Sequence, residues 1–467
     1  MSFQRPGLSF LLAACCAWGE SSAATEDWPQ WRGVRGNAMV ADFAAPAAWP
    51  EKLTQKWQVA VGDGVATPAL VGNRLYVYAR QDGNEILRCL ELSSGTELWR
   101  ASHAAKAISG PADGFPGPRC SPAVAHGSVV VVGVHGDVAC YDAENGDERW
   151  RITEFEGQVP RFNTSSSPLI FDEQCIVQLG DGNRGGVLCL KLADGSEVWR
   201  WDGQGPDYAS PTLAEIDGQP ILFAATTGRA VALHARTGAL LWEMEYVQGR
   251  YNATSPTVHG NLLLLAGPNR GVTALRVALE GDKLTASEAW RNDESTMVFN
   301  TPVATGEWLF GLTGTNQLFC LNLSDGRTTW TAGGTPAVAG GPGGPPAGER
   351  RGQRADRPDP ANAQERERGG RREGAGPPSG GGRGGRAGGG GGRGGGRGGY
   401  GSVVEAGPVL FTLTPAGQLN VVALDGGKYQ PLVSYPVAKG GTYAYPVIVG
   451  HYVLIKDADS LTLWEIK

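Results

Sequence analysis

The chain has 467 residues, of which 71 are Gly and 30 are Pro, and its formal net charge is −6. Gly is about twice as frequent as in an average protein, and Gly and Pro at this density break helices. The composition therefore disfavours a helical or doubly wound fold. The length suggests two or three domains, although closed all-β folds run longer as a single domain.

Residues 1–24 are predicted to be a targeting segment, with Arg5 as its positive region and an apolar stretch over 8–18 that is too short to span a bilayer. Two processing schemes fit this segment. A signal peptide can be cleaved after Ala24, or residues 12–15 can act as a lipobox that makes Cys15 a lipid-modified N-terminus. Both schemes predict an exported, soluble or peripheral protein in the periplasm or cell envelope, the second as an outer-membrane lipoprotein. Residues 25–52 form an N-terminal extension.

An internal repeat organises the rest of the chain. A Ser/Thr-Pro step opens a run of short apolar strands, and a Gly-containing turn and a closing Trp follow. The prolines of this step are Pro68, Pro122, Pro168, Pro211, Pro256, Pro302 and Pro446. The long gap before Pro446 holds a Gly/Arg-rich tract and one more unit, which begins at Ser402 without the Pro. The count of units is therefore eight.

Each unit is predicted to contain four antiparallel strands. In the third unit these are 167–170, 175–179, 186–190 and 197–200, and the last two are joined by a tight turn at 193–196 whose Gly supplies a positive φ. Four-stranded units of 40–50 residues in series are typical of a β-propeller. The predicted fold is therefore an all-β, eight-bladed propeller.

Ring closure provides a further expectation. The last unit ends at 461–466 with only three strands, whereas residues 54–61 match a Trp-bearing outer strand and stand just before the first unit. Inserting this N-terminal strand into the last blade removes an open edge. The propeller is thus expected to comprise 53–332 (closing strand and blades 1–6) and 401–467 (blades 7–8).

Two residue types recur at fixed positions of the repeat. Cysteines stand on the third strand of four separate blades and are expected to be small buried thiols, and no disulfide is expected between Cys120 and Cys175. The four are Cys89, Cys140, Cys189 and Cys320. Tryptophans on the outer strands are expected to pack between adjacent blades and to offer their N–H to the neighbouring backbone. They are Trp57, Trp99, Trp150, Trp199, Trp242, Trp290 and Trp330.

The ending Ala/Cys-x₅-Gly-x₃-Trp, present as Cys189, Gly195 and Trp199, resembles the tryptophan-docking repeat of the pyrroloquinoline quinone (PQQ) dehydrogenases. Over 25–332 and 401–467 the chain resembles the PQQ-like β-propeller repeat family of exported bacterial proteins. Its Asp-Trp-Pro-Gln-Trp-Arg-Gly segment at 27–33 resembles the segment that precedes the propeller in many members. The propeller lipoprotein of the outer-membrane β-barrel assembly machinery belongs to the same wider group. The resemblance specifies the fold more than the function.

Two departures from the dehydrogenases weigh against an enzyme. Their adjacent Cys pair beside the cofactor has no counterpart outside Cys15-Cys16, and no motif carrying their Glu, Asn and Asp calcium ligands can be matched. A Cys-x-x-Cys-His haem motif is also absent from the sequence. No catalytic or metal-binding residue is therefore assigned. PQQ is kept only as the cofactor of the alternative function, an oxidoreductase.

A binding site is expected where the loops before the innermost strands and the loops between second and third strands share one face of the ring. These loops are rich in Arg, Asn and Tyr, which suit an anionic or hydroxylated small ligand or a protein. The alternative is that they only bond to neighbouring blades and solvate the rim. The candidates are Arg119, Arg161, Asn163, Asp181, Arg184, Tyr208, Arg229, Arg250, Asn252, Arg270, Asn300, Asn316 and Tyr443.

Residues 333–400 hold 27 Gly and 12 Arg in 68 positions and are expected to be disordered. Their Arg-Gly-Gly steps resemble RNA-binding segments, but an exported protein rarely meets RNA, so no nucleic-acid partner is expected. An inert spacer is the default role, with contact to an anionic envelope polymer or to the acidic propeller as alternatives.

The leading hypothesis is an exported, monomeric, non-catalytic propeller that acts as a binding or assembly scaffold at the cell envelope. The alternative is a PQQ-dependent oxidoreductase with divergent cofactor ligands. A third option, a carbohydrate-active enzyme, requires two carboxylates that face each other across the funnel.

Overall fold

The structure is a computed structural model that describes residues 27–106, 108–109, 112–247, 249, 251–332 and 399–467. The expected targeting segment (1–24), residues 333–398 of the Gly/Arg tract and the candidate Arg250 lie outside these residues. The regular elements of the described part are all strands. Within it, we find no helix with the length and apolarity needed to cross a membrane.

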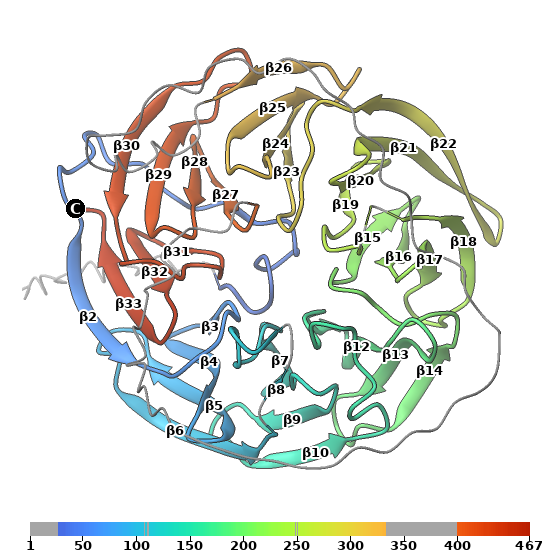
Figure 1. The fold of residues 1–467 in the computed structure, drawn as a ribbon, viewed down its shortest axis with the longest axis horizontal. Coiled ribbons are helices and arrows are strands. Elements are labelled where there is room, and N and C mark those ends of the chain that lie inside the picture. The colour runs from blue at the N-terminus through green and yellow to red at the C-terminus, as the bar shows by residue number, and fades with distance from the viewer. Residues whose placement is uncertain (1–26, 107, 110–111, 248, 250, 333–398) are drawn as a thin grey trace, which may run out of the picture. The chain divides into compact units, whose positions relative to one another are not determined.

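Eight antiparallel sheets follow one another around a ring (Figure 1). Blade 1 contains β3 (Ala69–Val71), β4 (Arg74–Gln81), β5 (Asn84–Glu91) and β6 (Glu97–Ala104). Blade 2 contains β7 (Ala123–Ala125), β8 (Ser128–Val132), β9 (Val138–Asp142) and β10 (Glu148–Ile152). Blade 3 contains β11 (Leu169–Phe171), β12 (Gln174–Gly180), β13 (Gly185–Lys191) and β14 (Glu197–Trp201). Blade 4 contains β15 (Thr212–Ile216), β16 (Gln219–Ala225), β17 (Arg229–His234) and β18 (Leu240–Glu245).

The second half of the ring repeats the same order with two modifications. Blade 5 contains β19 (Thr257–His259), β20 (Leu262–Gly267), β21 (Gly271–Glu280) and β22 (Lys283–Asn292). Blade 6 contains β23 (Val303–Thr305), β24 (Trp308–Leu312), β25 (Leu318–Asn322) and β26 (Thr328–Thr331). Blade 7 contains β27 (Ser402–Ala406), β28 (Val409–Leu413), β29 (Gln418–Ala423) and β30 (Pro431–Pro436), and β1 (Met39–Val40) joins its inner edge in parallel. Blade 8 contains β31 (Val447–Val449), β32 (Tyr452–Lys456) and β33 (Ser460–Glu465), with β2 (Thr54–Ala60) as its outer strand.

The predicted closure by the N-terminal strand is confirmed. Strand β2 pairs antiparallel with β33, from Thr54 opposite Glu465 to Ala60 opposite Ser460. This ladder completes the eighth four-stranded blade and confirms the eight-bladed propeller.

The hydrophobic core is divided into layers between neighbouring blades. One layer joins Val130 of blade 2 to Leu188 of blade 3, and another joins Phe223 of blade 4 to Leu263 of blade 5. Cys89, Cys140, Cys189 and Cys320 lie in four different layers, as their repeat position predicts, and all six described cysteines are buried and free.

The outer-strand tryptophans connect each blade to the next. Trp57 Nε1 donates a hydrogen bond to the carbonyl oxygen of Leu92 at 2.8 Å. Its ring covers Gly95, where φ is 70° and a Cβ would lie 2.9 Å from the indole, so only Gly suits this turn. Equivalent hydrogen bonds run from Trp99 to Ala143, Trp150 to Leu192, Trp199 to Ala235, Trp290 to Leu323 and Trp330 to Asp425.

Trp242 is the exception among the seven. Within the described residues its N–H has no such acceptor, because Val277, at the position of Leu92, lies inside the long β21–β22 hairpin and pairs with Ala286. The repeat predicts the tryptophan correctly, but the neighbouring blade has replaced the turn on which it would dock.

Trp57→Phe is expected to lower the free energy of unfolding by about 1 kcal/mol, because it removes the hydrogen bond to Leu92 and keeps an aromatic ring. Trp242→Phe, at a similarly half-buried site, is the matched control and should cost less than half as much. Urea unfolding of both variants and the wild type measures this difference. Equal losses would show that the indole N–H does not contribute to closure.

Candidate functional site

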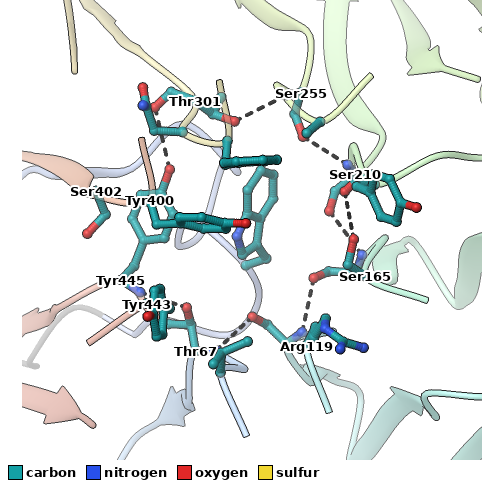
Figure 2. A pocket seen from close by; sticks show the side chains of 18 of the residues that line it. Thr67, Arg119, Ser165, Ser210, Ser255, Thr301, Tyr400, Ser402, Tyr443 and Tyr445 are labelled. Carbon is teal, nitrogen blue, oxygen red and sulfur yellow. Dashed lines mark hydrogen bonds between the residues drawn. The ribbon is translucent and has the colours of Figure 1, made fainter. Parts of the chain in front are cut away.

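A ring of hydroxyl groups joins successive blades around the central channel. The residue before a proline is held extended, and in six blades its backbone N–H donates to the hydroxyl of the corresponding residue in the next blade (Figure 2). These bonds run from Thr67 to Ser121 (3.0 Å), Ser121 to Ser167 (3.0 Å), Ser167 to Ser210 (2.9 Å), Ser210 to Ser255 (2.8 Å), Ser255 to Thr301 (3.2 Å) and Tyr445 to Thr67 (3.0 Å).

This hydroxyl ring is interrupted at blades 7 and 8. Ser402 is followed by Val403 in place of Pro, and its buried hydroxyl has no partner among the described residues. Tyr445 stands where the other blades have Ser or Thr, and its hydroxyl donates to Thr301 O at 3.4 Å. The interruption leaves room for a different element at the centre of the ring.

The N-terminal extension occupies that place, and in Figure 1 it runs into the interior of the ring. Trp28 is buried and exchanges two backbone hydrogen bonds with Leu70, each 2.8 Å. The guanidinium of Arg32, 1% exposed, donates to the carbonyl oxygens of Pro302 and Asn37. Trp31 contacts the Tyr445 ring edge-on at 6.0 Å between centroids. The segment before β2 therefore forms the floor of the channel.

A cavity of about 370 Å³ lies above this floor. Two tiers of residues line it, and every blade contributes one residue to each tier. The lower tier is the hydroxyl ring with Ser402 and Tyr445, and the upper tier stands two residues earlier in each blade. The upper tier consists of Val65, Arg119, Ser165, Tyr208, Ala253, Phe299, Tyr400 and Tyr443.

Aromatic rings form a continuous series around this cavity, which we call the aromatic cup. The centroid separations are 5.3 Å for Phe115–Tyr443, 5.5 Å for Tyr443–Tyr400, 4.2 Å for Tyr400–Phe299, 6.1 Å for Phe299–Tyr251, 5.4 Å for Tyr251–Tyr208 and 6.1 Å for Tyr208–Phe162. Such offset and edge-to-face pairs favour a rigid wall. The cup is thus a cavity wall that is mostly aromatic.

A second cavity of about 330 Å³ adjoins the cup and shares Tyr208 and Tyr251 with it. We call this cavity the polar annex, because its lining includes Arg161, Asp181, Asn183, Asp207 and Thr227. On the other side of Trp31 a third cavity, of about 420 Å³, lies between the N-terminal segment and strands β11 and β15.

Burial shifts the pKa values of several groups at these cavities. Burial lowers the pKa of Arg119, whose Nη2 donates to Phe115 O at 2.9 Å while its buried Nη1 has no acceptor among the described residues. Burial raises the pKa of Asp207 to about 6, against hydrogen bonds from the Asn252 N–H and from Thr227. The pKa of Tyr208 rises to about 12 for the same reason.

The structure brings some of the predicted site residues together and separates others. Arg119, Tyr208, Asn300 and Tyr443 line the cup. Arg161 and Asp181 line the annex together with Tyr208.

The other candidates hold the framework or lie elsewhere on the surface. Asn252 is buried and donates to Thr226 O and Tyr246 O. Asn316 accepts hydrogen bonds from the N–H groups of Gly399 and Gly401. Arg184 and Arg229 form surface ion pairs with Glu154 and Glu243. Asn163 and Arg270 belong to neither cavity lining.

Sequence reasoning missed the floor and most of the aromatic wall. Trp31, Phe162, Phe299 and Tyr400 line the cavity but are not among the candidates that the sequence predicts. Tyr400 is the last residue of the tract 333–400, which the sequence predicts to be a disordered insertion. Alignment of the eight repeats on the residue before the proline, or on Ser402 where the proline is missing, finds the upper tier, which stands two residues earlier in every blade.

The residues of the cup do not fit PQQ, a polycarboxylate for which the resemblance to the dehydrogenases implies a calcium ion with Glu, Asn and Asp ligands. Arg119 is the one cation of the described lining, which contains no Asp, Glu, His or Cys. In the described ranges, no three His, Cys, Asp or Glu side chains gather as metal ligands.

With this geometry established, the chain can be compared with known proteins. The PQQ-repeat family described as "Outer membrane protein assembly factor BamB" matches residues 40–200 and 83–332, which together span more than half of the chain. The chain belongs to this family of PQQ-like repeat propellers.

Two curated relatives carry the same name. The protein of Burkholderia pseudomallei is 26% identical over 237 residues, which cover 45% of this chain and 54% of the relative. That of Shewanella oneidensis is 24% identical over 225 residues, which cover 46% of this chain and 56% of the relative. The chain spans about half the length of the curated relatives it matches.

Solved structures share the fold at low sequence identity. BamB from Moraxella catarrhalis has a TM-score of 0.56 at 15% identity, with 89% of this chain and 98% of that chain covered. A europium-containing methanol dehydrogenase has a TM-score of 0.63 at 12% identity, with 94% of this chain and 98% of that chain covered. These two proteins show that the same ring is found in an assembly factor and in an enzyme.

The raised pKa of Asp207 predicts a pH-dependent stability. An unfolded Asp has an ordinary, lower pKa, so the folded state binds more protons between about pH 4 and pH 6 and the free energy of unfolding falls as pH rises through this window. Asp207→Asn should abolish this loss, which amounts to at most about 3 kcal/mol. Urea unfolding at both ends of the window measures it, and an unchanged pH dependence in the variant would contradict the assignment.

Proposed function

We propose that this chain is an exported, non-catalytic propeller that acts as a binding or assembly scaffold at the cell envelope and holds a ligand or partner in the aromatic cup. One observation carries the proposal. The described lining of the cup consists of aromatic rings, hydroxyls, small side chains and the Asn300 amide, with Arg119 as its single charged group. Such a surface binds through shape and stacking, and the described lining of the cup itself holds no carboxylate that could serve as an acid or base.

The family supports the envelope location. Its description and both curated relatives name an outer-membrane assembly factor. Residues 1–24 would direct export, either as a cleaved signal peptide or through a lipid anchor on Cys15. The protein would act as a monomer, since the eight blades already satisfy one another's edges.

Site-specific photo-crosslinking tests where the partner is held. A benzoylphenylalanine in place of Tyr400 should form adducts in the source cell about five times more often than one in place of Tyr429, which is exposed on the outer wall. Both positions hold a tyrosine beside another ring, at 4.2 Å for Tyr400–Phe299 and 5.6 Å for Tyr429–Trp330, so each replacement keeps an aromatic group. Similar yields from the two positions would contradict a partner at the cup.

The oxidoreductase alternative is tested separately. Purified protein mixed with PQQ and Ca²⁺ should show no bound-quinone absorbance and no dye reduction with alcohols or sugars, because the cup offers one cation and no acidic ligand. A quinoprotein dehydrogenase handled in the same way is the positive control. Stoichiometric quinone uptake with dye reduction would overturn the non-catalytic assignment.

A further inference from the structure

The aromatic cup and the polar annex meet at two tyrosines, and we propose that together they bind a saccharide. A sugar ring would stack on Tyr208 or Tyr251, and its hydroxyl groups would bond to the annex. The inference rests on the proposed function, because it names the chemical class of the ligand held at that face.

The two tyrosines provide the stacking surface. Tyr208 and Tyr251 border both cavities. Their centroids lie 5.4 Å apart at an interplanar angle of 90°, and the Tyr208 hydroxyl accepts the Phe162 N–H at 3.2 Å. The electron-rich face of an aromatic ring attracts polarised C–H groups, which one face of a pyranose presents. Fixed rings at a cavity junction therefore suit a sugar ring.

The annex combines hydrogen-bond donors with acceptors. The Asp181 carboxylate is fixed by the N–H groups of Asn183 (2.8 Å) and Arg184 (3.0 Å). The Asp207 carboxylate is fixed by the Asn252 N–H at 2.8 Å. Arg161 is exposed beside the Phe162 ring, and in the described part of the chain no carboxylate lies within ion-pair distance of it. A hydroxyl group both donates and accepts, so a row of sugar hydroxyls can satisfy this mixed set.

The charges favour a neutral ligand over the alternatives. The Asp181 and Asp207 carboxylates offset the guanidiniums of Arg161 and Arg119, so the described linings offer no net positive charge to a polyanion. A purely apolar side chain would leave the annex groups without partners, which costs binding energy. The cavities of about 370 and 330 Å³ each reach the size of small-ligand sites. A neutral oligosaccharide fills both parts.

An array of defined neutral and acidic bacterial oligosaccharides, followed by calorimetric titration of the best binder, tests the inference on the purified full chain. The wild type should bind neutral glycans. Tyr251→Ala should weaken binding about tenfold, and Arg161→Ala, at an exposed position with no ion pair among the described residues, about fivefold. Tyr429→Ala and Asp172→Asn, an exposed aromatic and an exposed carboxylate elsewhere, should change it less than about twofold.

The outcomes distinguish the saccharide site from the scaffold proposal and from the non-catalytic function. Binding of no glycan, of acidic glycans alone, or binding that Tyr251→Ala and Arg161→Ala leave intact would overturn the saccharide site. Adducts from position 400 that contain a protein, with no glycan bound, would leave the scaffold proposal standing and remove the saccharide. Hydrolysis of the bound glycan would support the saccharide site and overturn the non-catalytic function.

Discussion

Closure of the ring by strand β2 is the contact on which the rest of the structure depends. Its ladder with β33 joins residues about 400 positions apart, and the entropy of closing so long a loop grows only slowly with length. Without β2, blade 8 would keep an open edge. The turn at Gly95 in blade 1 would also lose the Trp57 ring that covers it. One strand thus completes one blade and docks on the next, and the channel exists because the ring closes.

The centre of the ring is built from a repeated bond and from its interruption. Around most of the channel, a hydroxyl of each blade accepts the backbone N–H of the preceding blade. Where blades 7 and 8 depart from the pattern, at Ser402 and Tyr445, the N-terminal extension enters and Arg32 donates to the carbonyl oxygen of Pro302. The irregular blades 7 and 8 therefore determine where the floor lies. The cup lies on one side of the floor residue Trp31, and the cavity of about 420 Å³ lies on the other.

The two tiers of the cavity differ in how far their residues vary from blade to blade. The lower tier repeats a hydroxyl because its oxygen holds neighbouring blades together. The upper tier, two residues earlier, has no such common role and varies from Val65 to Arg119 to Tyr400. Variation at a position that every blade presents to one axis produces a specific surface from a repetitive fold. The annex extends this surface on the side of blades 3 and 4.

The sequence by itself determined the number of blades, their strand order and the closing strand, because those depend on local periodicity and on turn residues that recur at fixed spacing. It also predicted several residues that line the cavities, including Arg119, Tyr208 and Tyr443. Only the tertiary structure decided that Asn252 and Asn316 hold the framework, that Trp31 forms the floor, and that Asp181 and Asp207 share a cavity with Arg161. The physical reason is that these contacts join different blades, and no local pattern records which side chains meet across the axis of a closed ring.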